Sequence, residues 1–219
     1  MSIREVNETY RHSLATFGDD PRALGWKSES EQHARFAALC DGLPRDVPLE
    51  VGDFGCGFAD LLPYLESQDF VVSRYVGIDV NSEMLDHAKE KVRPPGASSL
   101  QIVELKEDLE EVSPVDWWFV SGTWNVRGST SATEWRERVE EELQRLFLSA
   151  RSGVACNFLS DHVDFEDAAL FYAPVSQLID FVRSRLSRRF TIRHDYMPFE
   201  WTLTVLHEDG GPAANRPPG

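Results

Sequence analysis

The sequence is poor in cysteine and in long apolar runs, and each shortage excludes a class of protein. Only three of its 219 residues are cysteines, and no two of them form a Cys-x-x-Cys pair. This excludes a disulfide scaffold and predicts free thiols in a reducing compartment. No apolar run approaches the roughly 18 residues that a membrane-spanning helix needs, and the first residues do not resemble a signal peptide. We therefore expect a cytoplasmic protein.

Basic residues are also scarce relative to acidic ones. The chain holds 22 Lys and Arg against 37 Asp and Glu, which gives a formal net charge of −15. A surface of this sign repels nucleic-acid phosphates and anionic lipids. We therefore expect a small-molecule partner, with no nucleic acid and no membrane, while the oligomeric state is left open.

The order of predicted elements indicates three regions. Residues 1–45 are expected to form a helical cap, because apolar residues recur at helical spacing over 29–43 behind the possible cap residues Ser28 and Ser30. From 46 to 208 strands alternate with helices. The Gly- and Pro-rich segment 209–219 is expected to be disordered.

The alternating region predicts a mostly parallel α/β sheet with helices on both faces. The last two strands have no helix between them, so one strand is expected to run antiparallel. The expected strands are 49–54, 74–80, 100–105, 115–121, 153–159, 190–197 and 201–207, and the expected helices are 59–67, 82–92, 132–149 and 174–186.

A glycine loop between the first strand and the next helix is the most informative segment. Gly55 and Gly57 allow the backbone to approach a ligand, and the following helix offers free N–H groups. Asp79 ends the next strand, 22 residues after Gly57. An acid at this offset can accept hydrogen bonds from both hydroxyls of a ribose, which predicts a nucleoside-containing cofactor.

Two cofactor classes use such a loop. A dinucleotide site requires a third glycine where this chain has Asp60, whose carboxylate would repel a pyrophosphate. The chain also lacks the Tyr-x-x-x-Lys pair of short-chain dehydrogenases. A dehydrogenase is therefore poorly supported.

The second class is indicated by resemblance. Asp53-x-Gly55-x-Gly57 resembles the first motif of the class I, Rossmann-like S-adenosylmethionine-dependent methyltransferases, and Gly-Ile-Asp79-Val resembles their second. Ala59 stands where the third glycine of the motif is usual, a change expected to cost little. The likeness covers roughly residues 47–208, and it implies a seven-stranded sheet and S-adenosylmethionine as cofactor.

The resemblance also implies a set of cofactor contacts. Asp108, in Glu-Asp-Leu after the third strand, resembles the acceptor for the adenine amino group. Segments 24–36 and 121–125 resemble a small bacterial branch of the family, with Trp26 as a lid residue. The implied cofactor-binding residues are Trp26, Gln32, Arg35, Asp53, Gly55, Cys56, Gly57, Asp79, Val80, Asp108, Leu109, Ser121 and Gly122. Alternatively, Trp26 anchors the core, and Gln32 and Arg35 lie on an exposed helix face.

The segments after the fourth and fifth strands are the candidate acceptor site, since ligands of open α/β sheets bind at the carboxyl ends of strands. The residues expected to contact the substrate are Trp124, Asn125, Phe171 and Tyr172. His162 is the candidate general base because its ordinary pKa lies near neutrality. The alternative is that its loop is a solvated acidic segment, and no metal is expected.

These inferences predict methyl transfer to a small molecule by in-line displacement. A protein methyltransferase is one alternative, because an acidic surface attracts basic partners. The other is a non-catalytic module that binds the cofactor or a partner. The methylated atom is left open.

Overall fold

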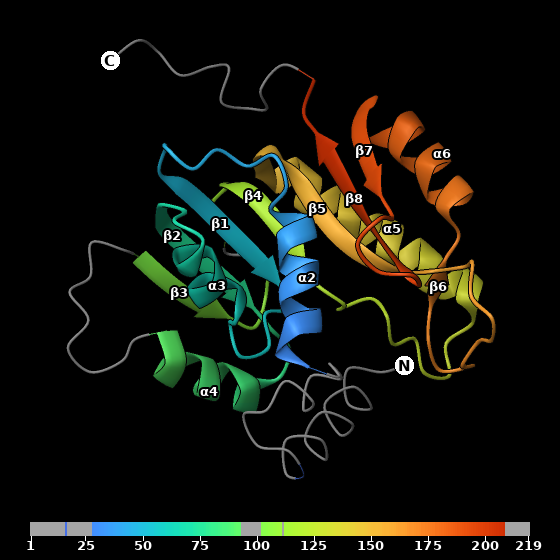
Figure 1. The fold of residues 1–219 in the computed structure, drawn as a ribbon, viewed down its shortest axis with the longest axis horizontal. Helices are drawn as coiled ribbons and strands as arrows, with labels where there is room; N and C mark the ends of the chain where they lie inside the picture. Colours follow the sequence, from blue (N-terminus) through green and yellow to red (C-terminus); the bar gives the residue numbers. More distant parts are fainter. Residues whose placement is uncertain (1–15, 17–27, 93–101, 111, 209–219) are drawn as a thin grey trace. The chain divides into compact units, whose positions relative to one another are not determined.

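The computed structural model describes residues 16, 28–92, 102–110 and 112–208, and it confirms the predicted α/β, Rossmann-like fold (Figure 1). The chain divides into two compact units, Met1–Val112 and Ser113–Gly219. Most of the predicted cap before residue 28, and the predicted tail, lie outside the described residues. The described elements in chain order are α2 (Glu29–Leu39), β1 (Leu49–Phe54), α3 (Leu61–Ser67), β2 (Val72–Ile78), α4 (Ser82–Val92), β3 (Ile102–Lys106), β4 (Val115–Val120), α5 (Ala132–Ser149), β5 (Ala150–Ser160), β6 (Tyr172–Ala173), α6 (Val175–Arg185), β7 (Arg189–Arg193) and β8 (Glu200–Leu206).

The first unit is built on three parallel strands in the order β3-β2-β1. Asp53 pairs in register with Gly77, and Gly77 pairs with Leu105. The three strands therefore end at the same edge, which brings together the glycine loop after β1, Asp79 after β2 and Asp108 after β3. Helix α3 packs on β2, α4 packs on β3, and α2 packs on α3 (Figure 1).

Two helices of this unit, α2 and α4, begin with a side-chain cap, and the cap at Ser28 was expected from the sequence. The Ser28 side chain accepts a hydrogen bond from Glu31 N at the start of α2. Asn81 Oδ1 accepts from the first backbone N–H groups of α4, those of Glu83 and Met84, at 3.0 and 3.3 Å. Each cap satisfies donors that the helix cannot satisfy itself, so these starts are set locally.

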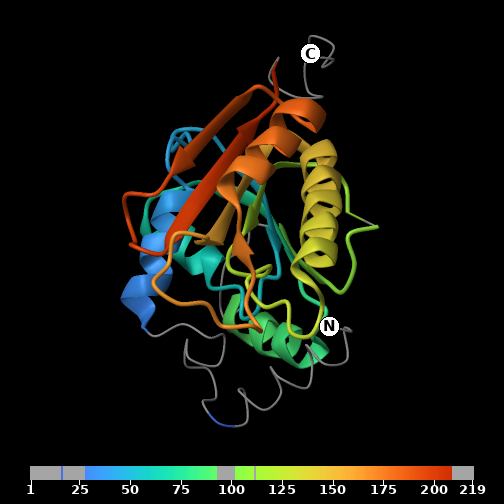
Figure 2. The same cartoon turned by 90° about the vertical axis from the view of Figure 1, so that its right-hand side faces the viewer.

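The second unit has the strand order β4-β5-β8-β7. Strand β4 is parallel to β5, while β8 is antiparallel to both of its neighbours, so the predicted antiparallel strand is confirmed. Helix α5 packs on β4 and β5 and lies beside α6 (Figure 2). The two-residue strand β6 adds to the seven predicted strands, because it is too short to show a periodicity in the sequence.

Large aromatic side chains fill the core of the second unit. Trp124 stacks on Phe158 with ring centroids 5.6 Å apart, and Phe158 lies 4.9 Å from Trp201. The Trp135 indole N–H donates to the Trp124 carbonyl at 2.8 Å. The segment after β4 is therefore anchored in the core by its own tryptophan.

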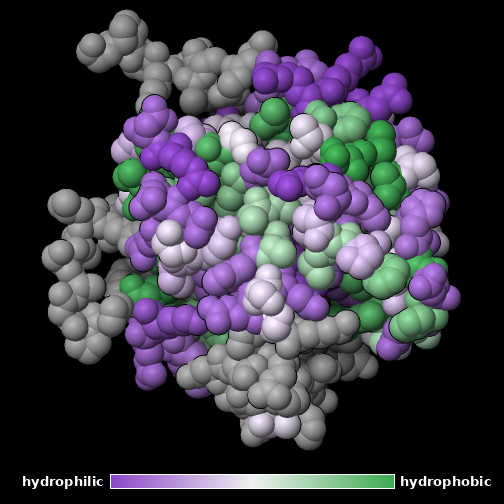
Figure 3. All heavy atoms as spheres, viewed as in Figure 1, coloured by the Kyte–Doolittle hydropathy of each residue, from purple (hydrophilic) through white to green (hydrophobic). Residues whose placement is uncertain are grey.

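On the face shown in Figure 3, hydrophilic side chains predominate and apolar ones lie in groups among them. Two large apolar side chains stand out, Phe165 at 82% and Leu148 at 65% exposure. Among the described residues, no helix combines the length and apolar character needed to cross a membrane.

Candidate functional site

The carboxylate of Asp79 holds the glycine loop in place. Its Oδ2 accepts a hydrogen bond from Gly57 N and its Oδ1 accepts one from Asn81 N, both at 2.9 Å. Burial raises the pKa of Asp79, and the two N–H bonds partly offset this. Each carboxylate oxygen accepts two hydrogen bonds when ionised, so both keep a lone pair for the hydroxyls of a ribose.

Three residues of the loop have left-handed backbone conformations. Gly55 has φ of 74°, Gly57 of 52° and Ala59 of 58°. An L-residue in this conformation costs about 1–2 kcal/mol, so the expectation that Ala59 costs little must be corrected. The position requires positive φ, which explains why the family motif has glycine there.

The Ala59→Gly variant is therefore expected to raise the free energy of unfolding by about 1 kcal/mol, or the melting temperature by about 2–4 °C. The matched control is Ala88→Gly, since Ala88 is equally buried but lies in α4. That control should lower stability by about 1 kcal/mol. Thermal unfolding of the two variants measures both effects. If both variants lose stability equally, the backbone of Ala59 is not strained.

Asp53, the first acid of the motif, lies in the interior of the first unit. It is 4% exposed, and Tyr75 Oη donates to its Oδ2 at 2.6 Å. Burial raises the pKa of Asp53 to about 7. Its role as a cofactor contact stays a prediction, and the partner Tyr75 was missed because the two residues meet only across neighbouring strands.

Gly77 allows the glycine loop to pack closely on β2. A Cβ atom at Gly77 would lie 2.7 Å from Leu105 Cδ2 and 2.9 Å from Cys56 Sγ. The buried thiol of Cys56 thus occupies space that only glycine leaves open. Burial also raises the pKa of Cys56 well above its ordinary value, so the thiol stays protonated and packs as an apolar group.

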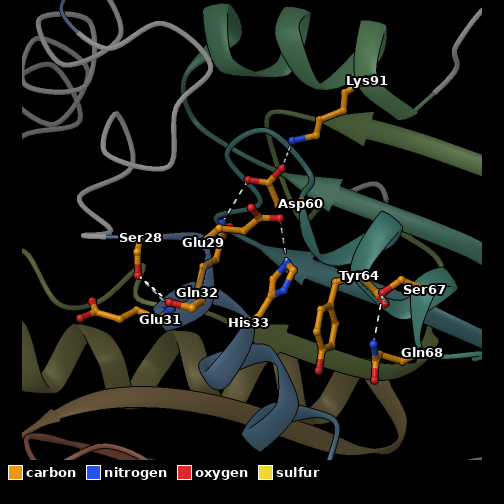
Figure 4. Close-up of polar contacts among 11 residues, drawn as sticks. Ser28, Glu29, Glu31, Gln32, His33, Asp60, Tyr64, Ser67, Gln68 and Lys91 are labelled. Atoms are coloured by element: carbon orange, nitrogen blue, oxygen red, sulfur yellow. Dashed lines mark hydrogen bonds and ion pairs between the residues drawn. The ribbon is translucent and has the colours of Figure 1, made fainter.

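Asp60 ties helix α2 and helix α4 to the end of the loop (Figure 4). Gln32 Nε2 donates to Asp60 Oδ2 at 3.0 Å, and Lys91 forms an ion pair with Asp60 Oδ1. The alternative of an exposed face is wrong for Gln32 and Arg35, which are 3% and 5% exposed. Arg35 Nη1 lies 4.0 Å from Glu31 Oε2. Their contacts with the cofactor stay predictions, and Trp26 lies outside the described residues.

The candidate adenine contacts lie at the same strand edge as Asp79. Asp79 N donates to Lys106 O at 3.1 Å, which joins the ends of β2 and β3. Asp108 follows two residues later, is exposed, and accepts from Glu110 N at 3.0 Å. Val80 is 42% exposed and Leu109 is half-buried. These residues are accessible to a ligand, and their roles stay predictions.

The segment 121–125 after β4 forms a tight turn in the second unit. Gly122 has φ of 73°, and Asn125 N donates to Gly122 O at 3.1 Å. Trp124 is 2% exposed, and its indole N–H donates to Glu142 Oε2 at 2.6 Å. This burial favours an anchoring role for Trp124 over the predicted contact with the substrate.

The segment before β6 lies directly against Asn125. Phe171 N donates to Asn125 O at 2.8 Å. The adjacent residues Val126 and Leu170 pair as an isolated antiparallel β-bridge. Phe171 is 2% exposed, whereas Tyr172 is half-buried and its hydroxyl accepts from Asp167 N at 2.9 Å. Of the predicted pair, Tyr172 is the more accessible, and both substrate roles stay predictions.

His162 lies on an exposed loop. Its side chain is 84% exposed, and Nε2 lies 3.9 Å from Asp161 Oδ1. Its backbone N–H donates to Ser160 Oγ at 3.1 Å. No packing fixes a ring so exposed, which favours the alternative of a solvated loop, and its role as general base stays a prediction.

Comparison with known proteins agrees with this geometry. Residues 52–126 match the family described as a methyltransferase domain. "Putative methyltransferase Rv1506c" of Mycobacterium tuberculosis is 32% identical over 161 residues, which cover 72% of this chain and 93% of that protein. The chain belongs to the class I S-adenosylmethionine-dependent methyltransferases.

Solved structures share the fold at low sequence identity. Magnesium protoporphyrin IX methyltransferase of Synechocystis, with bound S-adenosylhomocysteine, aligns with a TM-score of 0.62 at 14% identity over 91% of this chain and 95% of its own. The mycolic acid cyclopropane synthase CmaA1 aligns with the same TM-score at 11% identity over 88% of this chain and 78% of its own. S-adenosylmethionine is the cofactor, and the paired glycines with the Asp79 carboxylate fit its ribose.

Proposed function

We propose that this methyltransferase acts on a small-molecule acceptor by in-line displacement. The observation that carries the proposal is the uncharged segment Ser-Gly-Thr-Trp-Asn at 121–125, in a chain of net charge −15. A nucleic acid would meet repulsion from a surface of this charge, whereas an uncharged segment can bind a small acceptor without that repulsion.

The cofactor supplies a methyl group that is already activated by its sulfonium. The protein's part is then to bind the ribose through Asp79, to orient the acceptor and to exclude water. A general base is needed only for an acceptor that must lose its proton before attack.

Two alternatives predict different products. A protein methyltransferase would use the acidic surface to attract a basic partner. A non-catalytic module would bind the cofactor without turnover, although the retained Asp53, Asp79 and Asp108 favour a working cofactor site. The structural neighbours include magnesium protoporphyrin IX methyltransferase, the mycolic acid cyclopropane synthase CmaA1 and the Pnkp1/Rnl/Hen1 RNA repair complex, so the fold occurs in proteins of different function.

The test is to follow a labelled methyl group from S-adenosylmethionine into separated small-molecule, protein and RNA fractions of a bacterial extract. We expect the label in the small-molecule fraction together with S-adenosylhomocysteine, and much less of both with Asp79→Ala at the same cofactor concentration. Label in the protein fraction would support the first alternative. Cofactor binding without any S-adenosylhomocysteine would support the second.

A further inference from the structure

One short stretch of the second unit, residues 181–194, differs in charge from the rest of this acidic chain. This basic segment holds five of the 22 Lys and Arg residues and none of the 37 Asp and Glu residues. The chain of net charge −15 therefore has one local surface of the opposite sign. The five residues are Arg183, Arg185, Arg188, Arg189 and Arg193.

Three of these arginines are exposed and have no carboxylate partner among the described residues. They are Arg183, Arg185 and Arg188. Arg183 and Arg185 lie in the last turn of α6, where the helix dipole favours a positive charge. Arg188 lies beyond the helix, so the dipole does not account for it. The three charges are available to a partner.

The other two arginines have partners within the second unit. Arg189 Nη1 donates to the carbonyl oxygens of His207 and Glu208 at 3.1 and 3.0 Å, which ties the start of β7 to the end of β8. Arg193 Nε donates to Asp195 Oδ1 at 2.7 Å. Strand β7 therefore has a defined position beside the three available charges.

Strand β7 is the last strand at its end of the sheet (Figure 1). It pairs antiparallel with β8 and with no other described strand. Alternate residues of an edge strand direct their N–H and C=O groups away from the sheet, where a further strand can bind. Three residues separate the end of α6 from the start of β7, so the basic end of α6 adjoins this edge (Figures 1 and 2).

The chain offers no matching strand from its own termini or from the same edge of a second copy. Pairing β7 with β7 of another copy would place positive charges opposite one another, which is destabilising. Residues 1–27 contain four acids and four bases, so they carry no net charge to match. Residues 210–219 contain no acid and three prolines, which cannot donate to a neighbouring strand. The occupant is therefore sought in another molecule.

We propose that β7 and the basic segment bind an extended acidic segment of another protein. The segment adds a strand to the edge of β7 through main-chain hydrogen bonds, and its carboxylates pair with Arg183, Arg185 and Arg188. A nucleic acid has no row of N–H and C=O groups to match a strand edge, and a long one also meets the repulsion of the acidic chain. A short peptide avoids most of that repulsion, because charges beyond a Debye length of about 10 Å are largely screened.

The experiment uses the full-length protein and a short fluorescent peptide of alternating Glu and Thr, with the same peptide carrying Lys in place of Glu as control. Fluorescence anisotropy should show the Glu peptide binding at least about 10-fold more tightly than the Lys peptide at low salt, with the preference falling as salt is raised. The bound peptide should also slow hydrogen exchange in β7. Neither measurement involves cofactor or methyl acceptor, so the result is independent of the proposed function.

Three results would overturn the inference. The first is a Glu peptide that does not bind, or that binds no better than the Lys peptide. The second is binding that leaves hydrogen exchange in β7 unchanged. The third is tighter binding of a single-stranded RNA oligonucleotide or of anionic lipid vesicles, which would show a general site for anions.

A double variant tests the arginines themselves. Arg185→Gln with Arg188→Gln should weaken binding of the Glu peptide about 3- to 10-fold without changing the melting temperature, because both side chains are exposed. Lys89→Gln with Arg145→Gln removes the same charge from α4 and α5 and should bind as the wild type does. Charged residues also protect strand edges against self-association. If the arginine variant forms oligomers but binds the peptide as the wild type does, protection is their role and the inference fails.

Discussion

Replacing Asp79 by alanine is expected to weaken binding of S-adenosylhomocysteine by about 30- to 1000-fold, which corresponds to about 2–4 kcal/mol. The substitution removes the carboxylate that would accept from the ribose hydroxyls and leaves those hydroxyls unpaired. It also removes the acceptor of Gly57 N, so the glycine loop loses a contact that holds it in place. Isothermal titration calorimetry measures the affinity directly.

Two further variants separate these causes. Asp86→Ala removes an exposed acid from the neighbouring helix α4 and should bind as the wild type does. Asp79→Asn keeps one acceptor oxygen and should lose less affinity than Asp79→Ala. If Asp79→Ala binds S-adenosylhomocysteine as tightly as the wild type, the assignment of the ribose site is wrong.

Replacing Asp53 by asparagine should change how stability depends on pH. Burial raises the pKa of Asp53 from 3.8 to about 7, so between these values the folded protein holds a proton that the unfolded chain has released. The contribution of Asp53 to the free energy of unfolding therefore falls as pH rises from about 4 to about 7. Over the three pH units the fall is at most about 4 kcal/mol.

The measurement is chemical denaturation of the wild type and of Asp53→Asn at pH 5 and at pH 8. The variant should gain stability relative to the wild type at the higher pH, because its amide keeps an oxygen for Tyr75 and carries no charge. Asp86→Asn, at an exposed acid, should show no such gain. A stability difference between wild type and Asp53→Asn that does not vary with pH would mean that Asp53 titrates normally.

The features that the sequence predicted are those set within a few residues. The cap residue Ser28 acts on a backbone N–H group three positions away and was expected from its own neighbourhood, and Ser131 caps α5 in the same way. The glycine loop and Asp79 have a fixed offset because one strand and one helix separate them. Strand ends differ by up to four residues from the prediction, since hydrogen bonding to a neighbouring strand, and not hydrophobic pattern, decides where a strand stops.

The features that the sequence did not predict depend on contacts between distant segments. Asp60 reaches Gln32, which is 28 residues earlier, and Asn157 reaches Thr202, which is 45 residues later. The burial of Trp124 follows from its stacking on Phe158, and nothing in Ser-Gly-Thr-Trp-Asn distinguishes a buried tryptophan from one that faces a ligand. The cost of Ala59 was underestimated because the prediction considered only the small size of its side chain and not the positive φ that the position requires.

The ribose site is tested most directly by a cycle of four affinities. Wild type and Asp79→Ala are each titrated with S-adenosylhomocysteine and with its 2′-deoxy analogue. If Asp79 accepts from the 2′-hydroxyl, the wild type should bind the analogue at least about 10-fold more weakly, and Asp79→Ala should bind both ligands alike. An equal loss for both proteins on removal of the hydroxyl would show that Asp79 does not contact it, and would contradict the cofactor site described here.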